Sequence, residues 1–219
     1  MERRPASRQG LGALLGLILL SLATAAGCQT VLFSAMYLFQ GTTQAAEFND
    51  LNKKQVVVVC RQASGMEFSD PNVAKDLDKL ITQRLEKNGY KITVIEPAKV
   101  QRWEDENSWD EFLTVGRAMK AEMVVGVDLE QFSIREGQTV YQGKANATVK
   151  VVDCKTGKEA FSKSIPPLVY PPNHVLSTAD RQEAEFRREF EEILAERLAR
   201  FFYAHDPNDD VGLDAAALH

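Results

Sequence analysis

Apolar and polar positions divide the chain into an apolar run near its amino terminus and a later region of predicted strands and helices. Residues 55–60 (QVVVVC) form a continuous β-branched run, which is typical of a strand buried on both faces. Residues 73–85 carry apolar side chains at helical spacing, and the helix is predicted to end at Asn88-Gly89. Residues 91–95 (KITVI) predict a second strand, so this part of the chain indicates a βαβ unit or a close variant of one.

The remaining pattern predicts strands that return along the sheet and a long final helix. The predicted elements are a short helix over 97–104, a helix over 108–120 opened by a capping box of Ser108 and Glu111, strands over 122–132, 139–152 and 159–165, and a helix over 180–203. Residues 139–152 alternate between apolar and polar side chains, which predicts one wetter face. The sequence therefore predicts an α/β (α+β) domain with a mixed sheet of four to five strands, packed helices and a long carboxyl-terminal helix.

The amino terminus has the layout of an export signal. Three arginines precede an apolar run at residues 11–26, and small residues lead into Cys28. This segment resembles a bacterial lipoprotein signal with its lipobox. The resemblance implies cleavage after residue 27, a covalent lipid on Cys28 and a tether over residues 28–54. In that family Gln29 after the cysteine would favour the periplasmic face of the outer membrane.

Two other readings of the same segment stay open. Residues 11–39, left uncleaved, are long enough to cross a bilayer as a single-span anchor, with the arginines in the cytoplasm. Ordinary cleavage near Ala26 would instead release a soluble protein. All three readings predict that the rest of the chain is exported across a membrane.

Composition and charge limit the partners. The chain has 219 residues and a formal net charge of −5, and without residues 1–27 it keeps 23 basic and 30 acidic residues, a net of −7. An acidic balance argues against nucleic acid as a partner. We expect one periplasmic domain over residues 55–204, followed by a disordered acidic tail over residues 205–219.

The cysteines are consistent with export but leave two possibilities open. If Cys28 carries a lipid, Cys60 and Cys154 remain as a pair that an oxidising compartment could join in a disulfide. Alternatively, both are small buried apolar residues, as free cysteines often are.

The sequence predicts no enzyme. His, Cys and carboxylate residues match no metal-site spacing, no glycine-rich phosphate loop is present, and we expect no cofactor and no metal. His174 is interpreted as a solvated loop residue. Leu168 and Tyr170, between two Pro-Pro pairs, are the candidate partner-binding residues. The alternative is that both side chains cover the edge of the sheet.

The order of motifs resembles a known group of envelope domains. Residues 54–60 (KQVVVVC) and the following helix, residues 116–126 (GRAMKAEMVVG) and residues 149–158 (VKVVDCKTGK) are similar to segments of the TolB amino-terminal domain, CsgG and LpoB. The resemblance implies a non-enzymatic envelope lipoprotein that acts by protein–protein interaction, in envelope assembly, secretion or peptidoglycan-synthase support. A ring-forming homo-oligomer for secretion and a hydrolase of unrecognised type are the alternatives.

Overall fold

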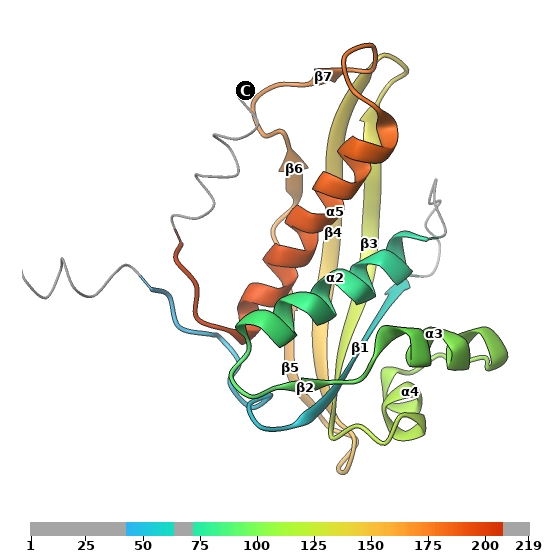
Figure 1. Ribbon diagram of the computed structural model, residues 1–219, viewed down its shortest axis with the longest axis vertical. Coiled ribbons are helices and arrows are strands. Elements are labelled where there is room, and N and C mark those ends of the chain that lie inside the picture. The colour runs from blue at the N-terminus through green and yellow to red at the C-terminus, as the bar shows by residue number, and fades with distance from the viewer. Residues whose placement is uncertain (1–42, 64–71, 208–219) are drawn as a thin grey trace, which may run out of the picture. The chain divides into compact units, whose positions relative to one another are not determined.

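The computed structural model describes residues 43–63 and 72–207, which form one compact unit that begins at Gln44. Its elements are β1 (Gln55–Gln62), α2 (Val73–Asn88), β2 (Thr93–Val94), α3 (Pro97–Glu106), α4 (Phe112–Ala118), β3 (Met123–Glu136), β4 (Val140–Asp153), β5 (Glu159–Ser164), β6 (Leu168–Tyr170), β7 (Leu176–Ser177), α5 (Glu183–Ala199) and the 3-10 turn η1 (Arg200–Phe202). Figure 1 shows α2 and α5 crossing in front of the long strands. The predicted α/β fold is confirmed.

The sheet is mixed and has five positions, in the order β2-β1-β3-β4-β5. β1 pairs in parallel with β2 and β3, whereas all pairs made by β4 are antiparallel. Along the edge that does not pair with β3, β4 pairs in turn with β5, β6 and β7. The last position is therefore divided among three short strands, which explains why seven strands fill the predicted four to five positions.

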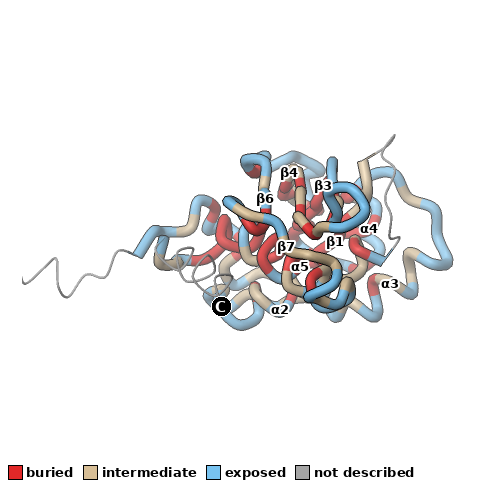
Figure 2. Tube along the Cα trace, turned by 90° about the horizontal axis from the view of Figure 1, so that it is seen from above, coloured by how far each residue is buried: buried red, intermediate tan, exposed pale blue. Residues whose placement is uncertain are grey.

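Both faces of β1 are buried, as its unbroken apolar run predicts. Val56, Val58 and Cys60 belong to the larger core cluster with residues of α2 and α5, while Val57 and Val59 belong to a second cluster with residues of α3 and α4. Successive side chains of a strand point to opposite faces, so the two clusters lie on the two sides of the sheet. The view from above in Figure 2 shows these buried segments enclosed by exposed loops and helix faces.

β4 has one apolar and one polar face, as its alternating sequence predicts. Tyr141, Ala145 and the alternate residues after them are buried, while the side chains between them are only half-buried. On the polar face, Asp128 of β3 accepts hydrogen bonds from Arg61 of β1 (2.6 Å) and Lys150 of β4 (3.0 Å). Burial opposes the ionised form of Asp128, but the hydrogen bonds from these two cations outweigh it and lower the pKa of the carboxyl.

The domain begins earlier than predicted. Residues 44–54, expected to be part of a tether, pack on the domain, with Phe48 and Leu51 buried in the larger cluster. The Phe48 amide donates to the Phe201 carbonyl at 2.9 Å, and the Phe48 ring lies 5.3 Å from that of Phe161. The predicted boundary at residue 55 is therefore corrected to about Gln44.

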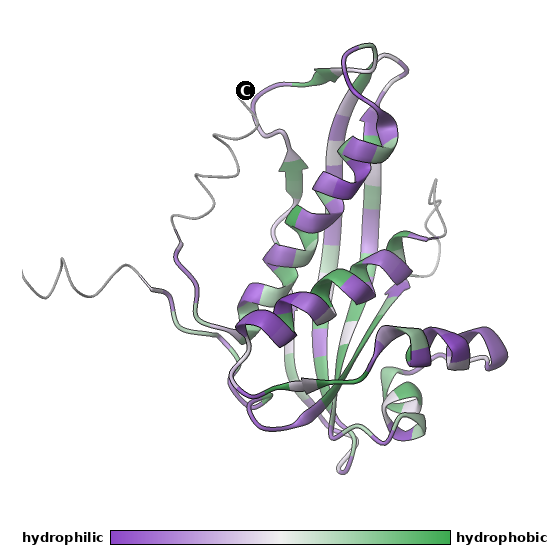
Figure 3. Ribbon diagram, viewed as in Figure 1, coloured by the Kyte–Doolittle hydropathy of each residue, from purple (hydrophilic) through white to green (hydrophobic). Residues whose placement is uncertain are grey.

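The helix predicted to begin at Ser108 begins later in the structure. The predicted capping box of Ser108 and Glu111 is not formed, because α4 begins at Phe112 with Glu111 as its N-cap and no side-chain cap hydrogen bond. Figure 3 shows hydrophilic and hydrophobic residues alternating along α2 and α5 and a mostly hydrophilic α3, whereas β1 is hydrophobic over most of its length.

Replacing Leu51 by Ala tests whether residues 44–54 belong to the folded unit. Leu51 has no exposed surface, so Leu51→Ala is expected to lower the free energy of unfolding by about 2–5 kcal/mol. The matched control is Asp50→Ala, at an exposed neighbouring position, with an expected change within about 0.5 kcal/mol. Urea unfolding followed by circular dichroism measures the free energy of unfolding of both variants. Equal losses would mean that residues 44–54 are part of the tether rather than of the folded unit.

Candidate interaction groove

The segment after β5 is extended, and its two Pro-Pro pairs keep it from forming a helix. The amide of Ile165 donates to the Ala147 carbonyl at 3.0 Å, and β6 then pairs with β4 through Leu168 and Tyr170, opposite Ala145 and Gly143. Side chains alternate along β6, so Leu168 and Tyr170 lie on the α5 side while Val169 points away.

Tyr170 is part of the core. Its exposed fraction is 3%, and its ring stacks on Phe186 and Phe190, with centroids 6.0 and 6.4 Å away. Its hydroxyl donates to Glu189 at 2.6 Å, and burial together with this acceptor raises the pKa of Tyr170. The prediction that Tyr170 contacts a partner is therefore corrected, because this side chain covers the sheet edge.

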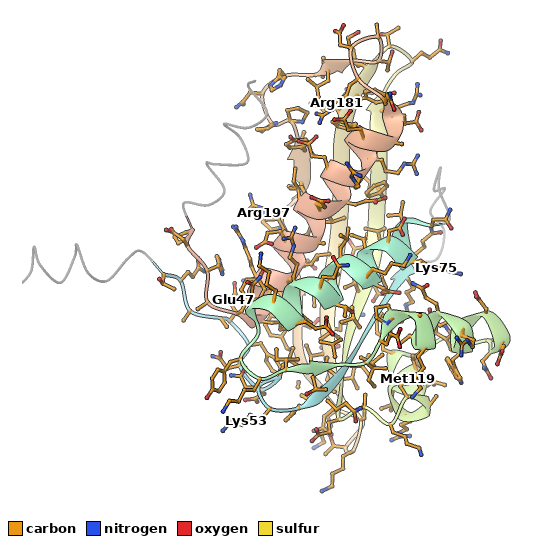
Figure 4. The ribbon with its side chains drawn as sticks, viewed as in Figure 1. Glu47, Lys53, Lys75, Met119, Arg181 and Arg197 are labelled. Atoms are coloured by element: carbon orange, nitrogen blue, oxygen red, sulfur yellow. The ribbon has the colours of Figure 1, made fainter. Side chains whose placement is uncertain are left out.

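Leu168 lines a groove of about 340 Å³ on the flank of the domain. The other lining residues are Gln44, Glu47, Lys163, Ile165, Pro166, Pro167, Arg197, Arg200, Phe201, His205 and Pro207. They come from three stretches of chain that are far apart in sequence. Figure 4 shows Glu47 and Arg197 on the same flank, beside the carboxyl-terminal half of α5.

The groove is lined by apolar and basic side chains, here called its floor and its rim, although Arg200 of the basic set is only 8% exposed. Ile165, Leu168 and Phe201 supply apolar surface, with the proline rings beside them. The charged lining residues are three cations, Lys163, Arg197 and Arg200, and one carboxylate, Glu47. Cations outnumber carboxylates among the lining residues, which favours an anionic ligand with apolar side chains that shares Lys163 and Arg200 with their partners Glu47 and Glu196.

Neighbouring carboxylates fix two of these cations. Lys163 is paired with Glu47, and its ammonium also lies 5.1 Å from the centre of the Phe201 ring. Arg200 donates to Glu196 at 3.1 Å. Burial opposes ionisation of Glu196, but hydrogen bonds from Tyr203 and Arg200 outweigh it and lower the pKa of this carboxyl. Ion pairs therefore hold Lys163 and Arg200 in position at the groove.

Both ends of the domain meet at this groove. Gln44 and His205 form an isolated antiparallel bridge, with backbone N···O distances of 2.7 and 3.0 Å. Both residues line the groove, and so does Pro207. The predicted tail over residues 205–219 therefore starts with residues held on the domain, and the rest of this tail, residues 208–219, lies outside the described part of the chain.

The two cysteines of the domain are free thiols. Cys60 belongs to the larger cluster and Cys154 to the cluster on the other face of the sheet, and the structure does not form the disulfide that the sequence left open. Both are buried, as the alternative interpretation holds. The predicted lipidation site, Cys28, lies outside the described residues.

A second polar cluster lies where α2 covers β1. The Cys60 amide donates to the Asp78 carboxyl at 2.5 Å, and Asp78 is only 2% exposed. Burial raises the pKa of Asp78 well above its ordinary value. Partial burial also raises the pKa of Glu104 to about 7, although Lys75 acts against this shift. These carboxyls hold protons that exposed carboxyls would release.

Within residues 43–63 and 72–207, no group of three or more His, Cys, Asp or Glu residues is arranged to hold a metal ion. Over the same residues, no helix is long and apolar enough to span a bilayer. The candidate anchor at residues 11–39 lies outside this described part.

Comparison with known proteins gives only distant similarity. No protein-family model matches the sequence, and none of the curated proteins matches it. Similar solved structures include the PelC dodecamer from Paraburkholderia phytofirmans (14% identity, 75% of this chain and 99% of that chain, TM-score 0.45). Lipoprotein GNA1162 from Neisseria meningitidis has 14% identity, coverage of 65% and 96%, and a TM-score of 0.43. The LpoB carboxyl-terminal domain from Escherichia coli has 11% identity, coverage of 51% and 80%, and a TM-score of 0.36. Similarity at this level carries no argument about function, which rests on the residues of this chain.

The raised pKa of Glu104 predicts how stability changes with pH. The folded state holds this proton up to about pH 7, whereas an ordinary glutamate releases it near 4.5. Stability is therefore expected to fall as pH rises from about 4.5 to 7, with Asp78 acting in the same direction. Glu104→Gln should reduce this fall by about 1 kcal/mol, a value discounted for solvent screening. Urea unfolding at pH 5 and 7.5 measures it, with Glu106→Gln as the exposed control. Equal slopes in both variants would contradict the prediction.

Proposed function

We propose that this chain is an exported envelope protein, anchored to a membrane by a lipid on Cys28, that acts by binding another envelope protein through the groove. The observation that carries the proposal is the position of the groove, since it lies where the anchor segment joins the domain. No catalytic chemistry is part of this function. We propose the periplasmic face of the outer membrane as its location, because Gln29 follows Cys28 and this position influences sorting in the lipoprotein family that the segment resembles.

The reach of the anchor supports this placement. Residues 29–43 separate Cys28 from Gln44. An extended chain spans at most about 3.3–3.6 Å per residue, so Gln44 would lie within about 60 Å of the membrane surface. The domain would thus meet proteins held in or on that membrane, and a groove beside its attachment point would face them.

The composition of the groove also supports binding to protein. Apolar floor residues can be covered by side chains of a partner, and burial of apolar surface contributes roughly 25 cal/mol per Å². The arginines on the rim can form charge-assisted hydrogen bonds with carboxylates. A segment of a partner protein that carries acidic and apolar side chains combines both interactions.

The decisive experiment places a charge in the groove and compares it with the same charge beside it. Leu168→Arg should reduce recovery of partner proteins from crosslinked membranes at least tenfold, because the new cation fills the groove and repels its basic rim. The matched control is Val169→Arg on the same strand, since Val169 is 36% exposed and does not line the groove. Thermal unfolding of both variants verifies folding. If the two variants recover the same partners, the groove is not the binding site.

The anchor is tested by the intact mass of the protein purified from its own host membranes. Cleavage before Cys28 together with a diacylglycerol and an acyl chain is the expected mass. Cys28→Ser is expected to remain uncleaved and unlipidated. A mass equal to the whole unmodified chain would replace the lipid with an uncleaved anchor over residues 11–39.

A further inference from the structure

The carboxyl-terminal tail starts inside the groove. The backbone bridge between His205 and Gln44 fixes the position from which the tail leaves, and Pro207, two residues later, is itself a lining residue. The described part of the chain therefore ends at the groove wall.

The tail carries the chemistry that the groove favours. Residues 208–214 read NDDVGLD, with carboxylates at Asp209, Asp210 and Asp214 and apolar side chains at Val211 and Leu213. The groove offers three cations on its rim and an apolar floor. Opposite charges and apolar surfaces are thus matched between two parts of the same chain.

We propose that residues 208–214 fold back into this groove and occupy it in the free protein. The tail is then the first ligand of the site, and a partner binds by displacing it, a consequence that rests on the proposed function. The apolar side chains of the tail cover the floor, and its carboxylates pair with Lys163, Arg197 and Arg200.

Tethering makes this occupancy attainable with few contacts. Seven extended residues span up to about 25 Å, enough to lie along a groove of this size. A segment joined by a short flexible linker has an effective concentration in the millimolar range. An intrinsic dissociation constant of about 0.1 mM would therefore give roughly ten occupied grooves for each open one.

Photo-crosslinking of the full-length protein tests the contact directly. A benzoylphenylalanine placed at Leu213 should form crosslinks within the same molecule to residues 163–168 or 197–201, mapped by mass spectrometry. The control probe replaces Val175, an exposed residue outside the groove lining, and should give no such crosslinks. The yield from position 213 should fall severalfold at 0.5 M salt, where the screening length drops to about 4 Å. Crosslinks only to a second copy, or none to the groove, would overturn the proposal.

Neutralising the tail tests its regulatory effect. The triple variant Asp209→Asn, Asp210→Asn and Asp214→Asn should lower the crosslinking yield from position 213 severalfold. It should also raise recovery of the partner by up to about tenfold, because the partner no longer has to displace the tail from the groove. A synthetic peptide of residues 206–219 added in excess should reduce that recovery again. Unchanged crosslinking in the triple variant would refute the charge pairing.

The two proposals fail in different ways. If position 213 gives no groove crosslinks but Leu168→Arg still abolishes partner recovery, the tail proposal falls and the partner site stands. If position 213 does crosslink to the groove but Leu168→Arg leaves partner recovery unchanged, the groove holds the tail alone and the proposed function falls.

Discussion

The parallel pairing of β1 with β3 is the interaction on which the rest of the domain depends. All residues from Val56 to Gln62 pair with β3, which places a strand buried on both faces at the centre of the fold. Its two faces need covering, and α2 covers one while α3 with α4 covers the other. α5 packs on α2 and on β3 and β4, and its last turn together with η1 brings Arg197, Arg200 and Phe201 to the groove.

The second half of the sheet is organised by a different rule. β4 is long, and the chain that returns along it is broken by prolines into β5, β6 and β7. Between β5 and β6, Ile165 still donates its amide to Ala147 of β4, and it forms one wall of the groove together with Pro166 and Pro167. Tyr170 restores the contact with α5 by stacking on Phe186 and Phe190. Of the two Pro-Pro pairs, Pro166 and Pro167 line the groove.

The sequence predicted what depends on local pattern and failed where distant segments meet. The β-branched run of β1, the stripe of α5 and the alternation of β4 are local, and the structure confirms them. Phe48 and Leu51 are two apolar residues in a polar stretch, and only the ring contacts of Phe48 with Phe161 and Phe202 and the complete burial of Leu51 show that they belong to the core. The groove also escaped prediction, because its lining comes from residues near 45, 165 and 200, although Leu168 was a candidate.

The bridge between Gln44 and His205 determines how the domain bears load. The two ends of the described chain are joined by the Gln44–His205 bridge and by the hydrogen bond from Phe48 to Phe201. Under the proposed anchoring, tension on the chain before Gln44 would reach these contacts first. The ladder between β1 and β3 lies further along the chain from that attachment, so the contacts at the two ends would take the load before the sheet does.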